Sequence, residues 1–215
     1  MHRTAATLAV VMLLIRAGHA VYKPHISRPV RSNRHTIITV SLALLALGYS
    51  VLVSTHALAQ VPSCADVTGT TVTITTNCND LSIRGDNSNV TINSGVEIST
   101  DTTGAVKTPG ADAIIINNGV IQAPTNRAFR TSGGTVLELR NNGTINANGN
   151  SAIRNGSTIQ LLINEGTISA VDSTIVNRNT ATIGKIINTG SITASGNNIG
   201  IDNSGTIRIL NNSQG

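Results

Sequence analysis

The chain beyond residue 60 lacks most of the side chains that carry chemistry. From Gln60 onward it contains no His, Trp, Tyr or Met, and Phe129 is its only aromatic residue. Without imidazole it has lost the commonest acid–base catalyst and transition-metal ligand. Without aromatic faces it has no platforms on which sugars or bases stack. We therefore expect no metal, no cofactor, no nucleic acid and no small-molecule substrate for this part of the chain.

Acidic side chains are also missing, but only from the first part of the chain. Residues 1–59 hold six Lys and Arg and no acid, whereas residues 60–215 hold nine bases and ten acids. The sequence pI of about 9.9 therefore reflects the first 59 residues. It is not the electrostatic footprint of a nucleic-acid-binding domain.

The basic first part has the pattern of a secretory leader. A basic stretch (residues 23–35) precedes an apolar run (residues 36–58), and Ala57-Leu58-Ala59 has the small residues that signal peptidases require. We predict an extended leader over residues 1–59, cleaved between Ala59 and Gln60. The alternative is a membrane anchor, but the apolar centre (residues 37–53) is shorter than the ~20 residues that span a bilayer.

Another apolar run precedes this signal. It covers residues 5–15 and is too short to span a membrane. It either lengthens the leader or reflects a start site placed too far upstream, with Met12 as the alternative start. Neither option changes the mature chain.

The rest of the chain is a repeat array with an Asn-x-Gly anchor. The anchor glycines lie at almost equal intervals and are Gly95, Gly119, Gly143, Gly166 and Gly190. Apolar residues keep fixed offsets from them: Ile121, Ile145, Ile168 and Ile192; Ala123, Ala147, Ala170 and Ala194; Ile115, Leu139, Leu162, Ile186 and Leu210; Val136, Ile159, Ile183 and Ile207. A looser column is Val106, Phe129, Ile153 and Val176.

This pattern predicts an all-β fold. Apolar residues alternate in short i, i+2 bursts, as in strands, and Asn, Gly, Ser and Thr separate the bursts. Three short strands and three turns fill about 24 residues, one coil of a parallel β-helix solenoid. Leucine-rich, calcium-binding nonapeptide and helical repeats do not fit, and in-phase apolar columns argue against a disordered low-complexity segment.

Stacking of the coils explains why the same polar residues recur in every repeat. Identical side-chain amides at strand spacing hydrogen-bond to one another as a ladder. We expect such a ladder from Asn93, Asn117, Asn141, Asn164, Asn188 and Asn212. The anchor glycines are expected at positive φ, and the small alanine column lets a wall bend inward.

The two ends of the array differ. Cys64 and Cys78 are expected to form a disulfide in an N-terminal cap, because paired cysteines in an exported chain are usually bonded. A redox or metal site is the alternative. We divide the mature chain into a cap and first coil (residues 60–92) and the array (residues 93–215). The array shows no C-terminal cap, so we expect a fragment or a premature stop.

The leader, the near absence of Cys and aromatics, and the N-x-G-(T/S/V)-I-x-A units together resemble the passenger region of bacterial autotransporters. The resemblance implies a right-handed parallel β-helix that is exported through the inner membrane and is then found in the periplasm, on the Gram-negative cell surface or secreted. It also implies a structural, adhesive role in virulence, and a partner: an outer-membrane translocator barrel, which these 215 residues do not contain. A host or bacterial surface receptor is the other implied partner.

An enzyme is the competing hypothesis, because β-helices also host carbohydrate-active enzymes. Such an enzyme, or its degenerate relative, needs clustered carboxylates with a nearby base. The acids instead occur singly, and Glu138 and Glu165 have different offsets from the repeat anchor. We therefore predict no catalytic residues.

Arg84-Gly85-Asp86 is the one short motif with a recognised mechanism. On an adhesive loop such a tripeptide offers its guanidinium to a carboxylate and its own carboxylate to a receptor-bound metal. That would predict attachment to host integrins. The alternative is a polar turn, with Gly and Asp-Asn present for backbone reasons.

Overall fold

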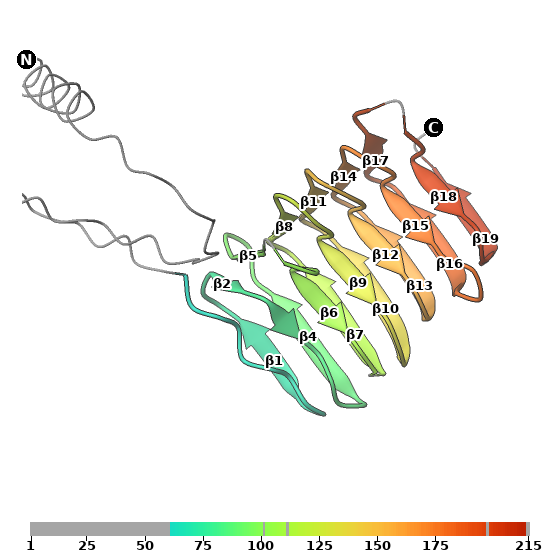
Figure 1. Ribbon diagram of the computed structural model, residues 1–215. Coiled ribbons are helices and arrows are strands. Elements are labelled where there is room, and N and C mark those ends of the chain that lie inside the picture. The colour runs from blue at the N-terminus through green and yellow to red at the C-terminus, as the bar shows by residue number, and fades with distance from the viewer. Residues whose placement is uncertain (1–60, 101, 111, 197, 214–215) are drawn as a thin grey trace, which may run out of the picture. The chain divides into compact units, whose positions relative to one another are not determined.

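The computed structural model describes residues 61–100, 102–110, 112–196 and 198–213. These residues form three parallel sheets and contain no helix. Successive strands enter the three sheets in rotation, so the chain winds as a parallel β-solenoid (Figure 1). We call one circuit through the three sheets a turn. About six turns stack along the axis, and equivalent residues of neighbouring turns are about 24 residues apart in the sequence.

The sheets are named in the order in which the chain first enters them. The first sheet has seven strands, β1 (Thr71–Ile74), β4 (Ser88–Ile92), β7 (Ala113–Asn117), β10 (Thr135–Asn141), β13 (Thr158–Asn164), β16 (Thr182–Asn188) and β19 (Thr206–Asn212). The second has six, β2 (Cys78–Asn79), β5 (Glu97–Ser99), β8 (Val120–Ala123), β11 (Thr144–Ala147), β14 (Thr167–Ala170) and β17 (Ser191–Ala194). The third has six, β3 (Leu81–Ser82), β6 (Val106–Thr108), β9 (Phe129–Thr131), β12 (Ile153–Asn155), β15 (Ile175–Asn177) and β18 (Ile201–Asn203).

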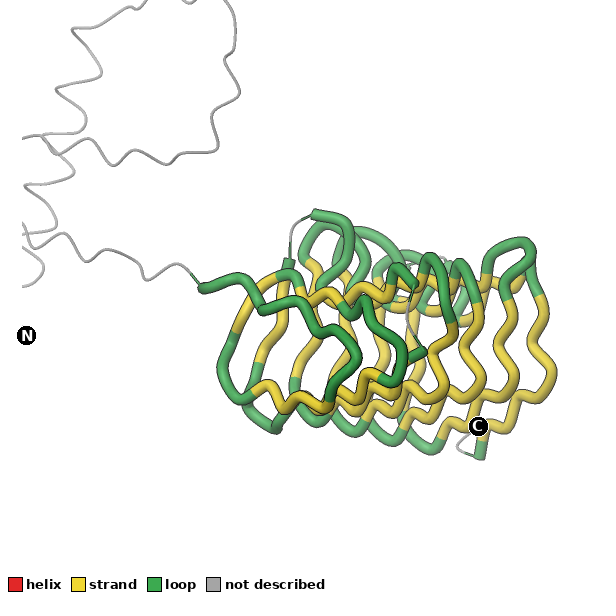
Figure 2. Tube along the Cα trace, turned by 90° about the horizontal axis from the view of Figure 1, so that it is seen from below, coloured by secondary structure: helices red, strands yellow, loops and turns green. Residues whose placement is uncertain are grey.

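Every strand pairs with the equivalent strands of the neighbouring turns. In the second sheet Ile145 pairs with Ile121 on one side and Ile168 on the other, and Ala147 pairs likewise with Ala123 and Ala170. Figure 2 shows this stacking from below, with strands side by side and loops joining them at the corners. The prediction of an all-β, parallel solenoid with turns of about 24 residues is confirmed.

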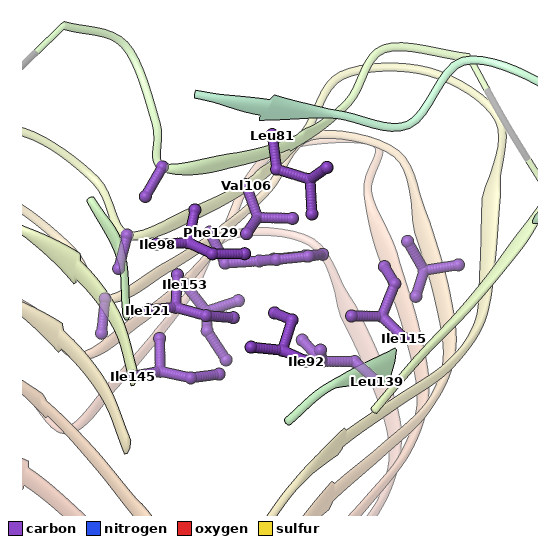
Figure 3. Packing of buried hydrophobic residues seen from close by; sticks show 14 of the residues in the cluster. Leu81, Ile92, Ile98, Val106, Ile115, Ile121, Phe129, Leu139, Ile145 and Ile153 are labelled. Atoms are coloured by element: carbon purple, nitrogen blue, oxygen red, sulfur yellow. The ribbon is translucent and has the colours of Figure 1, made fainter. Parts of the chain in front are cut away.

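The core is a set of apolar columns, one or more from each sheet. Ile98, Ile121 and Ile145 come from the second sheet, Leu81, Val106, Phe129 and Ile153 from the third, and Ile92, Ile115 and Leu139 from the first. All are buried and point into one interior (Figure 3). Each fully buried aliphatic side chain contributes roughly 1.5–3 kcal/mol, but only because neighbouring turns cover it.

One predicted core residue is replaced by its neighbour. Ile153 pairs with Ile175, which is fully buried, whereas Val176 pairs with Arg154 and lies on the outer face. The circuit from Ile153 to Ile175 contains fewer residues than the repeat period. Counting one full period from Ile153 therefore passes Ile175. This correction places Val176 beside a basic residue on the surface of the third sheet.

The later anchor glycines are required by close packing of the turns and not by a positive φ. Gly95 does have a φ of 78°, but Gly143, Gly166 and Gly190 are not among the residues with positive φ. A Cβ added to Gly166 would overlap the carbonyl oxygen of Gly143, and one added to Gly190 would overlap that of Gly166. The glycine column therefore lets the corners of successive turns stack directly on one another.

Candidate functional site

Most of the predicted asparagines form a hydrogen-bonded column at the end of the first sheet. Asn117 Nδ2 donates to Asn141 Oδ1 at 2.8 Å, and Asn141 donates to Asn164 at the same distance. Asn164 donates to Asn188 and Asn188 to Asn212, each at 2.7 Å. Because the amides donate in one direction along the axis, every internal member both gives and receives a hydrogen bond.

Asn93 lies outside this ladder, which is a correction to the predicted set. The residue that pairs with Asn117 in β4 is the buried Ile92, and Asn93 is exposed in the following corner. That corner contains residues 93–96, whereas the corner after Asn117 contains only residues 118–119. The longer corner shifts the Asn-x-Gly anchor out of register with the later ones.

A second polar ladder, which the sequence analysis missed, runs at the end of the third sheet. Thr131 Oγ1 donates to Asn155 Oδ1 at 2.8 Å, Asn155 donates to Asn177 at 2.8 Å, and Asn177 donates to Asn203 at 2.7 Å. Thr108, one turn before Thr131, is buried and its hydroxyl has no hydrogen-bond partner among the described residues. The ladder therefore begins at Thr131.

Cys64 and Cys78 are joined by a disulfide near the N-terminal end of the described solenoid. Cys78 lies in β2 and pairs with Ile98, while Cys64 donates its backbone N–H to the carbonyl of Asn79. The bond therefore ties the residues that precede β1 to the second sheet. The predicted cleavage site, Ala59 and Gln60, lies outside the described residues.

Arg84, Gly85 and Asp86 lie in the corner between β3 and β4. Arg84 Nε donates to Asp66 at 2.9 Å, although both side chains are more than half exposed. A Cβ on Gly85 would overlap the backbone at Gly69, and Asp86 Oδ1 accepts from the backbone N–H of Asp112 at 3.2 Å. These contacts favour the polar-turn interpretation, because all three residues have local structural partners.

Basic side chains gather on the outer face of the third sheet, where sequence reasoning expected no site. Lys107 pairs with Arg130, and Arg130 with Arg154, so three cations occupy equivalent positions on β6, β9 and β12. Each lies between two buried residues of its strand and is half-buried. Val176 and then Asp202 continue the column.

Two further arginines flank this column. Arg127 lies in the loop before β9, and Arg178 directly follows β15. At Gly104, in the loop before β6, an added Cβ would lie 3.5 Å from Arg130 Cβ and from Lys107 Cγ, and 3.7 Å from the carbonyl oxygen of Arg127. The loop backbone thus packs against the stems of the basic residues. We call Arg127, Arg130, Arg154 and Arg178 the arginine cluster.

The arginine cluster differs from the neighbouring Lys107 in its ion pairing. Lys107 is paired with Asp80 at 3.5 Å, but no member of the cluster forms an ion pair within the described part of the chain. Arg127 donates through Nη1 to Asn126 at 3.0 Å, while its Nε is buried without a partner in the same part. Because Arg127 Nε is buried, the donors left for a ligand are those of Arg130, Arg154 and Arg178, which have no ion pair in the described part of the chain.

Burial, together with repulsion between the arginines, lowers the pKa of two members of the cluster. Burial, followed by repulsion from Arg130 and Arg178, lowers the pKa of the Arg127 guanidinium. Burial, followed by repulsion from Arg127, Arg178 and Arg130, likewise lowers the pKa of Arg154. Arginine stays charged at any ordinary pH, so an anion bound here would relieve the repulsion.

The surface beside the cluster is hollowed. Arg178 lines this hollow together with Gly156, Val176, Asn179, Thr180 and Ser204. Val176 is the outer residue next to Arg154, so the hollow continues the arginine cluster toward later turns. The arrangement is an open surface elongated along the solenoid axis.

Two carboxylates converge on a single arginine, Arg140, at the first sheet. Arg140 Nε donates to Glu138 at 2.9 Å and its Nη1 to Glu165 at 3.3 Å. Hydrogen bonding to Glu138 is the largest cause of a raised pKa of Arg140, against a smaller opposing effect of burial. Both carboxylates are held by one guanidinium, which is an ion-pair network across two turns.

Neither a metal site nor a membrane-spanning helix occurs in the part of the chain that the structure describes. No group of three or more His, Cys, Asp or Glu in these residues is arranged to hold a metal ion. No helix among them is long and apolar enough to cross a membrane.

Comparison of the chain with family models, with curated proteins and with solved structures gives no match. The class of protein is therefore defined by the fold, a parallel β-solenoid built on polar and apolar ladders. Its distinguishing surface feature is the arginine cluster on the third sheet.

Proposed function

We propose that the protein is an exported surface protein whose solenoid acts as a structural and adhesive rod. The observation that carries this proposal is the in-register stacking of all three sheets, with each turn adding about 4.8 Å to the axis. Such a stack presents long, flat outer faces, which suit extended contacts with a surface. On this proposal the fold is right-handed and the chain is an autotransporter-like passenger.

The sequence before the solenoid supports export. The basic and apolar stretches that end at Ala57-Leu58-Ala59 are typical of a secretory signal. The disulfide between Cys64 and Cys78 suits an oxidising compartment outside the cytoplasm. The partners on this proposal are an outer-membrane translocator barrel and a receptor or polymer at a cell surface.

Expression of the full chain in a Gram-negative host tests the proposal. We expect the intact mass of the protein outside the cytoplasm to match a chain that begins at Gln60 and contains one disulfide. An Ala57→Arg/Ala59→Arg variant is the control, because bulky charged residues at the cleavage site block processing. Uncleaved protein retained in the cytoplasm from the unaltered chain would overturn the proposal.

A further inference from the structure

The arginine cluster has the geometry of a site for an extended ligand. Arg130 and Arg154 lie on adjacent strands, about 4.8 Å apart along the axis. Arg127 belongs to the same turn as Arg130. Arg178 directly follows β15, which is the neighbour of the strand that contains Arg154. The four cations thus span three successive turns, and a ligand that runs along the axis would meet them in sequence.

Arginine chemistry specifies anionic groups on that ligand. The guanidinium is planar and matches sulfate, phosphate or carboxylate through two parallel hydrogen bonds. Arg130, Arg154 and Arg178 form no ion pair within the described residues, so their guanidinium groups keep donors for such groups. Several anions at once are needed to offset four cations.

A single-stranded nucleic acid is disfavoured, and a polysaccharide must be held through its anionic groups, because the only aromatic side chain after position 60 is buried and cannot stack on bases or on sugar rings. Proteins that bind single strands combine a basic groove with aromatic side chains that stack on bases. Phe129 is the only aromatic residue after position 60, and it is fully buried. An exported rod also meets the acidic polymers of cell surfaces.

We propose that Arg127, Arg130, Arg154 and Arg178 form a binding site for a linear sulfated polysaccharide that lies along the third sheet. This names a partner class for the adhesive role proposed above and rests on that role. The chain from residue 60 onward has one more acid than base. Attraction of a polyanion by net charge is therefore not expected, and binding must come from the local cluster.

The test measures binding of heparin, a densely sulfated linear polysaccharide, to protein purified from cells that express the full chain. Arg130→Gln/Arg154→Gln removes two cluster cations, and Lys185→Gln/Arg208→Gln removes two from the first sheet as the matched control. We expect the first variant to weaken heparin binding about tenfold or more, which corresponds to about 1.4 kcal/mol. The control should change it less than twofold. Thermal unfolding of each variant confirms that it is folded.

Two further probes decide the ligand class. Fully desulfated heparin should bind at least tenfold more weakly than heparin, and so should a thymidine oligonucleotide of similar charge. The proposal is overturned by no binding of heparin, by equal losses in the two double variants, or by equal affinity for either probe. Because the assay needs only purified folded protein, it can fail while the export test succeeds, and the reverse.

Discussion

Asn141 donates a hydrogen bond from its side-chain amide to that of Asn164, one turn further along the solenoid, at 2.8 Å. Both side chains are fully buried, and Asn164 passes the same bond on to Asn188. A chain of amides of this kind is stable only when every turn contributes its member. The ladder therefore links the conformation of each corner to that of its neighbours.

Removing one rung of the ladder should be costly. Asn164→Ala leaves an N–H of Asn141 and the oxygen of Asn188 without their partner and opens a cavity. We expect the free energy of unfolding to fall by about 2–4 kcal/mol. Asn93→Ala is the control, since Asn93 is exposed and outside the ladder, and should change stability by less than about 0.5 kcal/mol. Urea unfolding measures both, and equal losses would contradict the ladder's role.

The glycine column makes a second prediction about the corners. Gly166→Ala should lower stability by about 1–3 kcal/mol, because the new methyl group overlaps the carbonyl oxygen of Gly143 and the two turns must separate. Gly110→Ala has no atom within 4 Å of the added Cβ and should leave stability unchanged or raise it by up to about 1 kcal/mol. Thermal unfolding distinguishes them. A Gly166 variant as stable as the unaltered protein would show that the corners do not stack so closely.

The second ladder predicts opposite effects for two threonines. Thr108→Val should stabilise the protein by about 1 kcal/mol, because it removes a buried hydroxyl with no partner among the described residues. Thr131→Val should destabilise it by about 1–3 kcal/mol, since the Thr131 hydroxyl donates to Asn155 and accepts from the backbone N–H of Gly156 at 3.0 Å. Chemical denaturation of both variants gives the sign of each change in the free energy of unfolding. Losses of similar size would contradict the assignment of Thr131 to the ladder and of Thr108 to a place outside it.

The disulfide should stabilise the N-terminal end. It closes a loop with a sequence separation of 14, which corresponds to about 3 kcal/mol on the chain-entropy model. We expect unfolding under reducing conditions to occur at lower denaturant, and hydrogen exchange to rise most in β1 and β2. A Cys64→Ala/Cys78→Ala variant should behave the same way without reductant. Identical unfolding curves with and without reductant would contradict this prediction.

The sequence predicts the repeat far better than the local exceptions to it. The inward columns that contain Ile121 and Leu139 follow from a nearly constant period, because stacking requires like residues at equal intervals. The sequence misplaces Asn93 because its corner is longer than the next, so the same offset from the anchor glycine gives a different register in that turn alone. Sequence spacing alone does not show which corner absorbs an insertion.

The arginine cluster escapes sequence reasoning for a related reason. Lys107, Arg130, Arg154 and Arg178 recur at nearly the period of the array, which is a usable signal. Only the strand register shows that the first three residues share an outer face. It also shows that Val176, and not Arg178, occupies the equivalent position in the next strand.

The second ladder is hidden in the sequence because its members do not keep the period. Asn155 and Asn177 are 22 residues apart, whereas Asn177 and Asn203 are 26 residues apart. The corners between these strands absorb the difference, so only the strand register shows that the three amides stack.

In-register stacking of turns is the central claim, and a pair of engineered cross-links tests it most directly. Asn146 and Ser169 are partners on the outer face of adjacent strands, so their Cα atoms lie about 4.8 Å apart, within reach of a disulfide. Thr193 is the partner of Ser169 in the following turn, about 9.6 Å from Asn146 and too far to bond.

Peptide mass mapping under non-reducing conditions reads out both pairs after mild oxidation. We predict that Asn146→Cys/Ser169→Cys forms its cross-link and that Asn146→Cys/Thr193→Cys does not, while Cys64 and Cys78 remain bonded in both. Failure of the first pair to cross-link, or equal cross-linking of the two pairs, would contradict the stacked solenoid.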